Sequence, residues 1–219
     1  MNETRGPQRR RRADTRREIL DTAIEVMAER GVAGLSLSEV ARRVGIRQPS
    51  LYKHFASLNA VYDELFREGA EQQREAVARA LRGRAPGLPA LAAAVEALGR
   101  VAMAHPVHAQ LVAWRPVPEF TPSAEAFRPS VELVELVRAA LHHAVSAGEL
   151  RPEAGSDAGV ALLSIVVTGT LSQQLANEPG AGYEGGRFTS LLPQAFAMFV
   201  RHFTPGGEQP CPGSEPPTP

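Results

Sequence analysis

The chain has 219 residues, of which 43% are hydrophobic and 5% aromatic, and its 24 basic and 24 acidic side chains give a formal net charge of zero. A hydrophobic share of this size can build a core, which excludes a wholly disordered chain. The single cysteine, Cys211, excludes a disulfide framework and a thiolate metal cluster, and the polar first residues lack the apolar stretch of a secretory signal. We therefore expect a soluble, cytoplasmic protein of one or two domains.

The charges are unevenly distributed along the chain. Residues 1–58 hold 12 basic and 7 acidic side chains, whereas residues 59–219 hold 12 basic and 17 acidic ones. The excess of positive charge in residues 1–58 favours a polyanionic partner for that part of the chain, although a solvated basic tail has the same composition. Residues 1–13, with four consecutive arginines at 9–12, are too highly charged to fold alone, and the sequence predicts a disordered basic arm there.

Four helices are predicted between residues 14 and 66. Capping boxes mark the first turn of two of them, glycines in the C′ position end them, and a proline suits the first turn of the third. These boundaries depend on Thr15, Glu18 and Gly31 for the first helix, Ser36, Glu39 and Gly45 for the second, Pro49 for the third, and Ser57 for the fourth.

The remainder of the chain also has helical periodicity. Helices are expected over 88–104, 106–114, 123–147 with a kink or restart at Pro129, 156–176, and along the apolar stripe 188–203, where Pro193 must fall in the first turn. The fold class is therefore all-α, with about nine helices. We expect an N-terminal domain over 14–66, a C-terminal regulatory and dimerisation domain over 67–203, and a disordered Pro- and Gly-rich tail over 204–219.

Residues 36–55 have the pattern of a helix-turn-helix, because a capped short helix, a glycine turn and a second short helix follow in order. In such a unit the second helix enters the major groove and its N-terminal side chains meet base edges. Arginine suits guanine, glutamine suits adenine, and hydroxyl groups suit phosphates. A helical hairpin with merely solvated polar side chains is the alternative. The predicted DNA-binding set is Ser36, Arg47, Gln48, Pro49, Ser50, Tyr52, Lys53 and His54.

Two stretches of this region are distinctive, namely Leu35-Ser36-Leu37-Ser38-Glu39-Val40-Ala41-Arg42-Arg43-Val44-Gly45-Ile46 and Gln48-Pro49-Ser50-Leu51-Tyr52-Lys53-His54-Phe55. They resemble the DNA-binding domain of the TetR family of transcriptional regulators, strongly over residues 14–66. The resemblance implies a homodimer whose C-terminal domain binds a small molecule and so releases DNA. It also implies phosphate contacts by Ser36 and Tyr52, base contacts by Arg47, Gln48 and Ser50, and a place near the DNA backbone for His54.

One position departs from the family pattern. The family usually has a lysine where this chain has Leu58, and that lysine contacts a phosphate at the start of the fourth helix. Leu58 cannot make this contact. The resemblance therefore leaves the affinity for DNA open, and the arginine-rich arm is a candidate source of the missing charge.

Residues 158–177 contain no charged side chain. A membrane helix is one interpretation, but several Ser, Thr, Gln and Asn side chains argue against it, because polar groups are costly in lipid. A helix that is apolar nearly all round is typically buried on two sides, here by its own core and by a second copy. Together with the stripe over 188–203, it predicts a homodimer built as a four-helix bundle across a two-fold axis. Burial wholly within one chain is the alternative.

Several large apolar side chains lie around the proline-rich loop 115–122. With two polar anchors they predict an apolar pocket for a small-molecule effector, although ordinary core packing explains them equally well. The predicted ligand-binding set is Met103, Leu111, Trp114, Phe120, Phe127, Thr168 and Gln173.

Other motifs are weak. Residues 180–185 match G-x-G-x-x-G, but the strand that a dinucleotide site requires does not precede them. The histidine pairs at 105/108 and 142/143 lack the spacing of a helical zinc site, so we expect neither a metal nor a cofactor. The leading interpretation is a dimeric repressor that an apolar ligand releases from a palindromic operator. An effector-independent regulator or an activator is the alternative, and an enzyme on a helical scaffold has no catalytic constellation to support it.

Overall fold

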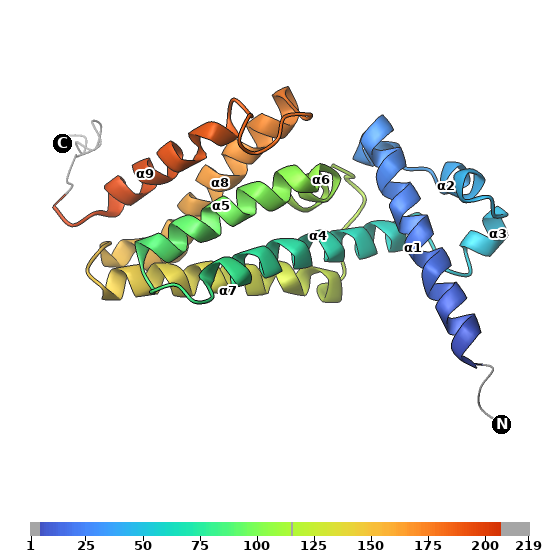
Figure 1. The fold of residues 1–219 in the computed structure, drawn as a ribbon, viewed down its shortest axis with the longest axis horizontal. Helices are drawn as coiled ribbons and strands as arrows, with labels where there is room; N and C mark the ends of the chain where they lie inside the picture. The colour runs from blue at the N-terminus through green and yellow to red at the C-terminus, as the bar shows by residue number, and fades with distance from the viewer. Residues whose placement is uncertain (1–4, 115, 207–219) are drawn as a thin grey trace, which may run out of the picture.

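The computed structural model describes residues 5–114 and 116–206, and within these ranges the chain is all-α, with nine helices and no strand. A small N-terminal domain lies at one end of the molecule and a longer helical C-terminal domain at the other (Figure 1). The helices are α1 (Arg5–Arg30), α2 (Leu37–Val44), α3 (Gln48–Leu51), α4 (Leu58–Leu81), α5 (Leu88–Ala104), α6 (Pro106–Trp114), α7 (Ala124–Ser146), α8 (Asp157–Asn177) and α9 (Leu192–Phe203), with short 3₁₀ turns at Val32–Gly34, Pro152–Gly155 and Thr189–Leu191.

The first helix is longer than the sequence indicated. The prediction of a disordered arm before a helix that starts at Thr15 is wrong for the described residues, because α1 is continuous from Arg5. The Thr15 hydroxyl lies inside the helix and donates to the Arg11 carbonyl oxygen at 3.0 Å, so it does not cap a helix end. Pro7 does not interrupt the helix, since it falls in the first turn, where its missing N–H has no intrahelical partner.

The N-terminal domain is held by an apolar core that α1, α2, α3 and the first half of α4 share. Leu51 of α3 is completely buried, and so are two α1 side chains, Ile19 and Val26. The Tyr62 hydroxyl of α4 donates to the Val32 carbonyl oxygen at 2.9 Å, which ties α4 to the turn after α1. The short helices α2 and α3 are thereby fixed against a rigid base.

Most of the predicted helix boundaries are confirmed. The hydroxyl oxygens of Ser57, Ser123 and Ser156 each accept a hydrogen bond from the backbone N–H three residues on, at 3.1 Å, and so cap α4, α7 and α8. Pro193 lies in the first turn of α9, as expected. The α7 helix continues through Pro129 rather than restarting there. The tail predicted over 204–219 lies almost wholly outside the described residues.

The C-terminal domain packs α5, α7, α8 and α9 around a second apolar core. By length and composition α8 alone among the described helices could cross a membrane, with a mean hydropathy of 1.4 over its most apolar window. Only 28% of that window is buried within the chain. Much of this apolar helix is therefore left uncovered by its own protomer.

Candidate nucleic-acid interface and ligand cavity

The turn into α3 and its first residues form the most exposed part of the helix-turn-helix. Gly45 ends α2 in the left-handed conformation, with φ of 75°, which lets the chain reverse sharply into α3. Apolar residues at 51 and 55 anchor the segment in the core. The side chains of Arg47, Gln48, Pro49, Tyr52 and Lys53 are exposed, whereas those of Ser50 and His54 are half-buried. Five of the predicted DNA-contacting residues in this segment are therefore accessible, and two are partly covered.

Ser36 lies where the sequence predicts, at the N-cap of α2, but its side chain does not cap the helix. Its hydroxyl instead pairs with the Ser38 hydroxyl at 2.8 Å. No side chain accepts a hydrogen bond from the first N–H groups of α2 among the described residues, so these donors and both hydroxyls are available to an anion.

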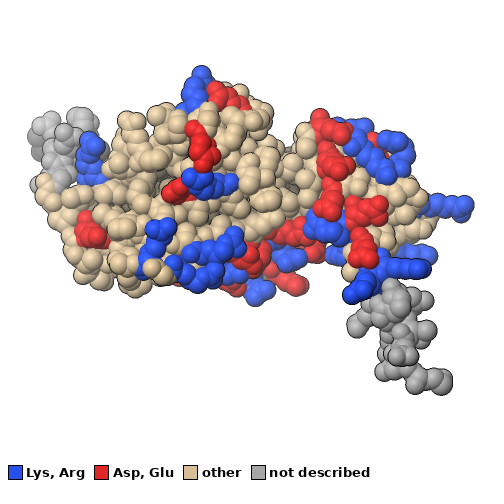
Figure 2. All heavy atoms as spheres, in the orientation of Figure 1, with Lys and Arg blue, Asp and Glu red and all other residues tan. Residues whose placement is uncertain are grey.

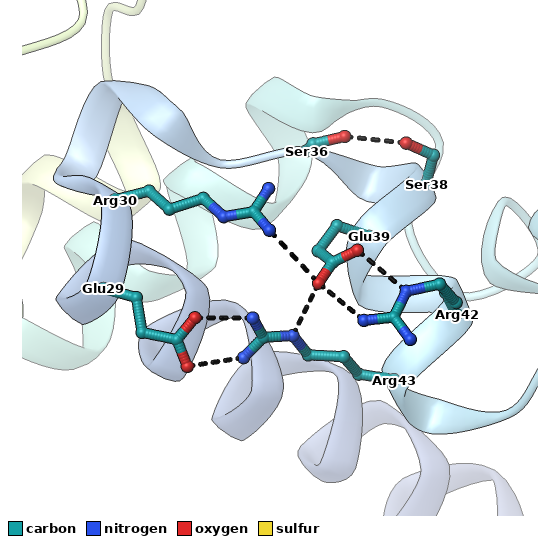
Figure 3. Close-up of polar contacts among 7 residues, drawn as sticks. All are labelled: Glu29, Arg30, Ser36, Ser38, Glu39, Arg42 and Arg43. Carbon is teal, nitrogen blue, oxygen red and sulfur yellow. Dashed lines mark hydrogen bonds and ion pairs between the residues drawn. The ribbon is translucent and has the colours of Figure 1, made fainter.

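The carboxylate of Glu39 does not complete a capping box either. It binds the guanidinium of Arg42 at 2.9 Å and that of Arg43 at 2.8 Å, and these hydrogen bonds lower the pKa of Glu39 to about 2. Arg43 also reaches back to Glu29 on α1, with distances of 2.5 and 2.7 Å, and Arg30 approaches Glu39 at 3.4 Å (Figure 3). This network fixes α2 to α1 and neutralises its arginines internally.

His54 sits where α1, α3 and α4 meet. Its carbonyl oxygen accepts a hydrogen bond from Arg16 at 2.8 Å, and the same guanidinium binds Glu64 at 2.7 Å and lies 4.1 Å from the centre of the Phe55 ring. Burial lowers the pKa of His54, and the charges of Arg12 and Arg16 lower it further, so the imidazole is neutral at pH 7. In the described structure its buried Nδ1 has no hydrogen-bond partner.

Leu58, at the position where the resemblance leads one to expect lysine, is half-buried at the first residue of α4. Its side chain packs against the N-terminal core. It contributes packing, and the start of α4 presents no charge from this position.

The C-terminal domain contains a cavity of about 640 Å³ between α4, α5, α6, α7 and α8, which is partly open to solvent. Among the predicted ligand-binding residues, Trp114, Phe127 and Thr168 line it. Met103 packs instead beside a small cluster of α5, α6 and α8 residues, Leu111 and Phe120 belong to the N-terminal core, and Gln173 is exposed. The structure thus brings three of the seven predicted residues to one cavity and leaves four elsewhere.

The cavity wall is apolar apart from a few neutral polar groups, and no charged side chain lines it. Trp114 Nε1 donates to the Ser172 hydroxyl at 2.6 Å, which joins α6 to α8 beside the cavity. The buried Ser130 hydroxyl has no partner within the described part of the chain. Sequence reasoning missed Gln73, Ser130, Ser164 and Ser172, although the four-residue spacing of Ser164, Thr168 and Ser172 places them on one face of α8.

The glycine-rich segment and the histidine His108 can be placed in the described structure. Residues 180–185 lie in the loop between α8 and α9, away from any strand in the described ranges. No group of three or more His, Cys, Asp or Glu side chains suited to a metal occurs among the described residues. His108 is buried against α4, where its Nε2 lies 3.8 Å from Glu68 and Glu68 in turn binds Arg17 of α1 at 2.7 Å. This histidine is a packing residue at the domain junction.

Residues 19–65 match the protein family described as bacterial regulatory proteins, tetR family. The activator FasR of Mycolicibacterium smegmatis is 34% identical over 86 residues, which are 39% of this chain and 39% of FasR. The class D tetracycline repressor of Escherichia coli is 38% identical over 50 residues, or 23% of each chain. The matched stretches therefore span well under half the length of these relatives, all of which are named as regulators and not as enzymes.

Solved structures extend the similarity of fold to both domains. The TetR family regulator PfmR of Thermus thermophilus has a TM-score of 0.66 at 22% identity, with 84% of this chain and 97% of PfmR covered. FadR of Bacillus subtilis, solved with stearoyl-CoA, has a TM-score of 0.64 at 18% identity, with 88% and 99% covered. Residues 19–65 therefore form a DNA-binding domain of the tetR family type, and the two-domain fold of the chain is similar to that of TetR family regulators.

Proposed function

We propose that the protein is a cytoplasmic, homodimeric repressor that binds a palindromic operator and is released by a small, largely apolar molecule. One observation carries this proposal: the single helix α4 both contributes to the N-terminal apolar core, which also holds Leu51 of the recognition helix, and contributes to the wall of an uncharged cavity. A molecule bound in that cavity therefore contacts the element on which the DNA-binding surface rests.

The DNA-binding role rests on the exposed surface at residues 47–53. Arg47 and Gln48 offer the bidentate donors and acceptors that suit guanine and adenine, and Ser50 lies beside them. Tyr52 and Lys53, on the same surface, suit phosphate oxygens, as does the uncapped start of α2 near Ser36. We assign base reading to the first group and backbone contacts to the second.

The dimer is proposed to form through α8 and α9. Ile165 of α8 is 67% exposed and Met198 of α9 is 63% exposed, although both are large apolar side chains. Charged side chains gather over the N-terminal domain, whereas large areas of the C-terminal domain carry none on the face seen in Figure 2. Pairing α8 and α9 with those of a second copy would cover this apolar surface and set two recognition helices about 34–36 Å apart, as successive major grooves require.

The effector is proposed to be neutral or to carry its charge outside the cavity. A volume of about 640 Å³ suits a drug-sized or acyl-chain-sized molecule, and a wall without charged side chains does not stabilise a buried ion. FadR, solved with stearoyl-CoA, is a structural neighbour whose ligand has a long apolar part. Ser130, whose hydroxyl has no partner among the described residues, is our candidate for orienting a polar group of the ligand.

The test of the DNA-binding role begins with selection of an operator from random duplexes. In fluorescence anisotropy, Gln48→Ala should reduce the discrimination between bases at one operator position by about 1–3 kcal/mol, because the bidentate hydrogen bonds to that base are removed. The ranking of operator variants by affinity should change accordingly. Lys53→Ala should weaken binding to all sequences alike, because phosphate contacts carry no sequence information. An unchanged ranking for Gln48→Ala would contradict the assigned role.

The test of release uses Trp114, the only tryptophan of the chain. Apolar and amphipathic compounds that change its emission should also lower operator affinity by 5–150-fold, which corresponds to a coupling of about 1–3 kcal/mol. If compounds change the Trp114 emission but leave operator affinity unchanged, the cavity binds ligands without regulating DNA binding.

Activation of transcription is the second candidate, because the relative FasR is named an activator. A reporter gene placed behind the selected operator distinguishes the two: deletion of the regulator raises expression for a repressor and lowers it for an activator.

A further inference from the structure

We propose that the N-terminal turns of α1, residues 5–12, are a second DNA-contacting element that binds the sugar-phosphate backbone beside the helix-turn-helix. This inference rests on the proposed DNA-binding function and adds to it a surface outside the helix-turn-helix. The ligand is duplex DNA, recognised by its charge and not by its sequence.

The first argument is the distribution of unpaired positive charge. The cationic side chains Arg16, Arg17, Arg30, Arg42 and Arg43 all form ion pairs with carboxylates of the same domain. Among the side chains that the structure describes in this domain, the cations without an ion pair are Arg10, Arg11, Arg12, Arg47 and Lys53. More than half of the free positive charge therefore lies on the first turns of α1.

The second argument is position. The Arg12 guanidinium donates to the Lys53 carbonyl oxygen at 3.2 Å, and one turn later Arg16 donates to the His54 carbonyl oxygen at 2.8 Å. These two hydrogen bonds place α1 directly against the end of the recognition segment. The helix then continues beyond this contact, so that its first turns project from the domain on the side of α3 (Figure 1).

The third argument is reach. The seven residues before Arg12 extend about 10 Å at 1.5 Å per residue, which equals about three base-pair steps measured along the axis of the duplex. The side chains of residues 10–14 are exposed, and no part of the described chain covers them. The first turns of α1, residues 5–12, are therefore long enough to follow the DNA backbone next to the phosphates that the helix-turn-helix contacts, and the exposed side chains there are accessible to it.

The fourth argument is the electrostatic cost of this helix in the absence of a partner. Like charges three or four residues apart on a helix repel, and cations at a helix N-terminus oppose the helix dipole. The four consecutive arginines in the first turns repel one another, interact unfavourably with the helix dipole, and have no apolar face to bury. Contact with a polyanion offsets both unfavourable electrostatic interactions. We infer that DNA stabilises this part of α1 and that the extension compensates for the absent charge at Leu58.

The experiment compares the dependence of DNA affinity on salt in matched variants. Arg10→Gln, Arg11→Gln and Arg12→Gln are combined in one variant, and exposed arginines near the far end of α4, Arg79, Arg82 and Arg84, are replaced by glutamine in the control. Both variants lose the same charge. Operator affinity is measured by anisotropy over a range of salt concentrations on a duplex obtained by selection.

The slope of log K against log salt should fall by about 0.9 for each phosphate that the variant no longer neutralises, and so by up to about 5 for the six arginines of a dimer. The control should keep the wild-type slope. Replacement of the same three arginines by lysine should restore most of the slope, since lysine also neutralises phosphate. Hydroxyl-radical footprints of the glutamine variant should shorten by about three nucleotides at one end of each half-site.

A further variant, with only Arg10→Gln and Arg11→Gln, guards against damage to the hydrogen bond between Arg12 and Lys53. If both glutamine variants keep the slope and footprint of the control, the inference is wrong. The proposed function is tested separately, because Gln48→Ala would still alter the ranking of operators in that case. If the wild-type protein binds no duplex, the function fails together with the inference.

Discussion

Gln174 is a fully buried polar side chain near the end of α8, and it organises the loop that leads into α9. Its Oε1 accepts hydrogen bonds from the backbone N–H groups of Phe188 at 2.9 Å and Thr189 at 3.2 Å. Its Nε2 donates to the Glu178 carbonyl oxygen at 3.0 Å. One side chain therefore satisfies three backbone groups that connect α8 to α9.

Substitution of Gln174 by leucine keeps the volume of the side chain but leaves these backbone groups without a partner. A fully buried group that loses its hydrogen bond costs about 1–3 kcal/mol, and a partly buried one costs less. Only the bond from the Thr189 N–H is fully buried, while those to Phe188 and Glu178 are partly buried, so we expect the free energy of unfolding to fall by about 2–5 kcal/mol. Typical total stabilities are about 5–15 kcal/mol, so the loss is a large share. For a domain of this size it corresponds to a melting temperature lower by roughly 5–15 °C.

Gln173→Leu is the matched control, because Gln173 is the neighbouring residue and its exposed side chain bonds, within the described part of the chain, to Asn177 alone. Its effect on stability should stay within about 0.5 kcal/mol. Urea unfolding followed by circular dichroism, at one protein concentration for all three proteins, measures both values. Equal losses for the two variants would refute the assignment of a structural role to the buried amide.

Three other perturbations test separate parts of the structure. Met198→Asp changes a side chain that is 63% exposed in the protomer, so it should abolish the dimer in light scattering without lowering protomer helicity, and a stable dimer would contradict the role of α9. Gly69→Ala would bring a Cβ to 2.9 Å from the His108 Cβ, so overpacking of about 1–3 kcal/mol should outweigh a gain in helix propensity of about 1 kcal/mol, and a raised melting temperature would argue against this close approach. Because the pKa of Glu39 is lowered to about 2 from 4.5, its ion pairs stabilise the fold above pH 4.5 and are lost as pH falls from 4.5 towards 2, and Glu39→Gln should remove this part of the acid sensitivity in urea titrations.

Helix boundaries were predictable where local chemistry determines them. The serines that cap α4, α7 and α8 act through bonds to residues three positions away, so the sequence alone contains the whole interaction. The predicted helix start at Thr15 was wrong because the same sequence pattern also occurs inside a helix, where the threonine hydroxyl donates to the carbonyl oxygen one turn back. Nothing near Thr15 stops the helix, and α1 therefore extends to Arg5.

The ligand cavity was only partly predictable because its walls depend on how helices cross. Phe120 and Leu111 have the composition of a pocket lining, but they are drawn into the N-terminal core, where Phe120 packs 5.5 Å from the Tyr62 ring. Gln173 and Gln174 are adjacent and chemically identical, yet one is exposed and the other fully buried. In a helix that is apolar on nearly all sides, the sequence does not indicate which face meets the core.

The continuity of α4 has a mechanical consequence. Its 24 residues form a rod of about 36 Å, with one end in the N-terminal core that also holds Leu51 of the recognition helix and the rest along the C-terminal domain. The cavity meets α4 at Phe66 and Gln73, about 12 and 22 Å from the first residue of the helix. A tilt of about 5° there moves that end by about 1–2 Å, and two copies related by a two-fold axis double this to about 2–4 Å out of the 34–36 Å that separates successive grooves. Under the proposed function, a ligand therefore disrupts operator binding by shifting the recognition helices and leaves every hydrogen bond inside the helix-turn-helix intact.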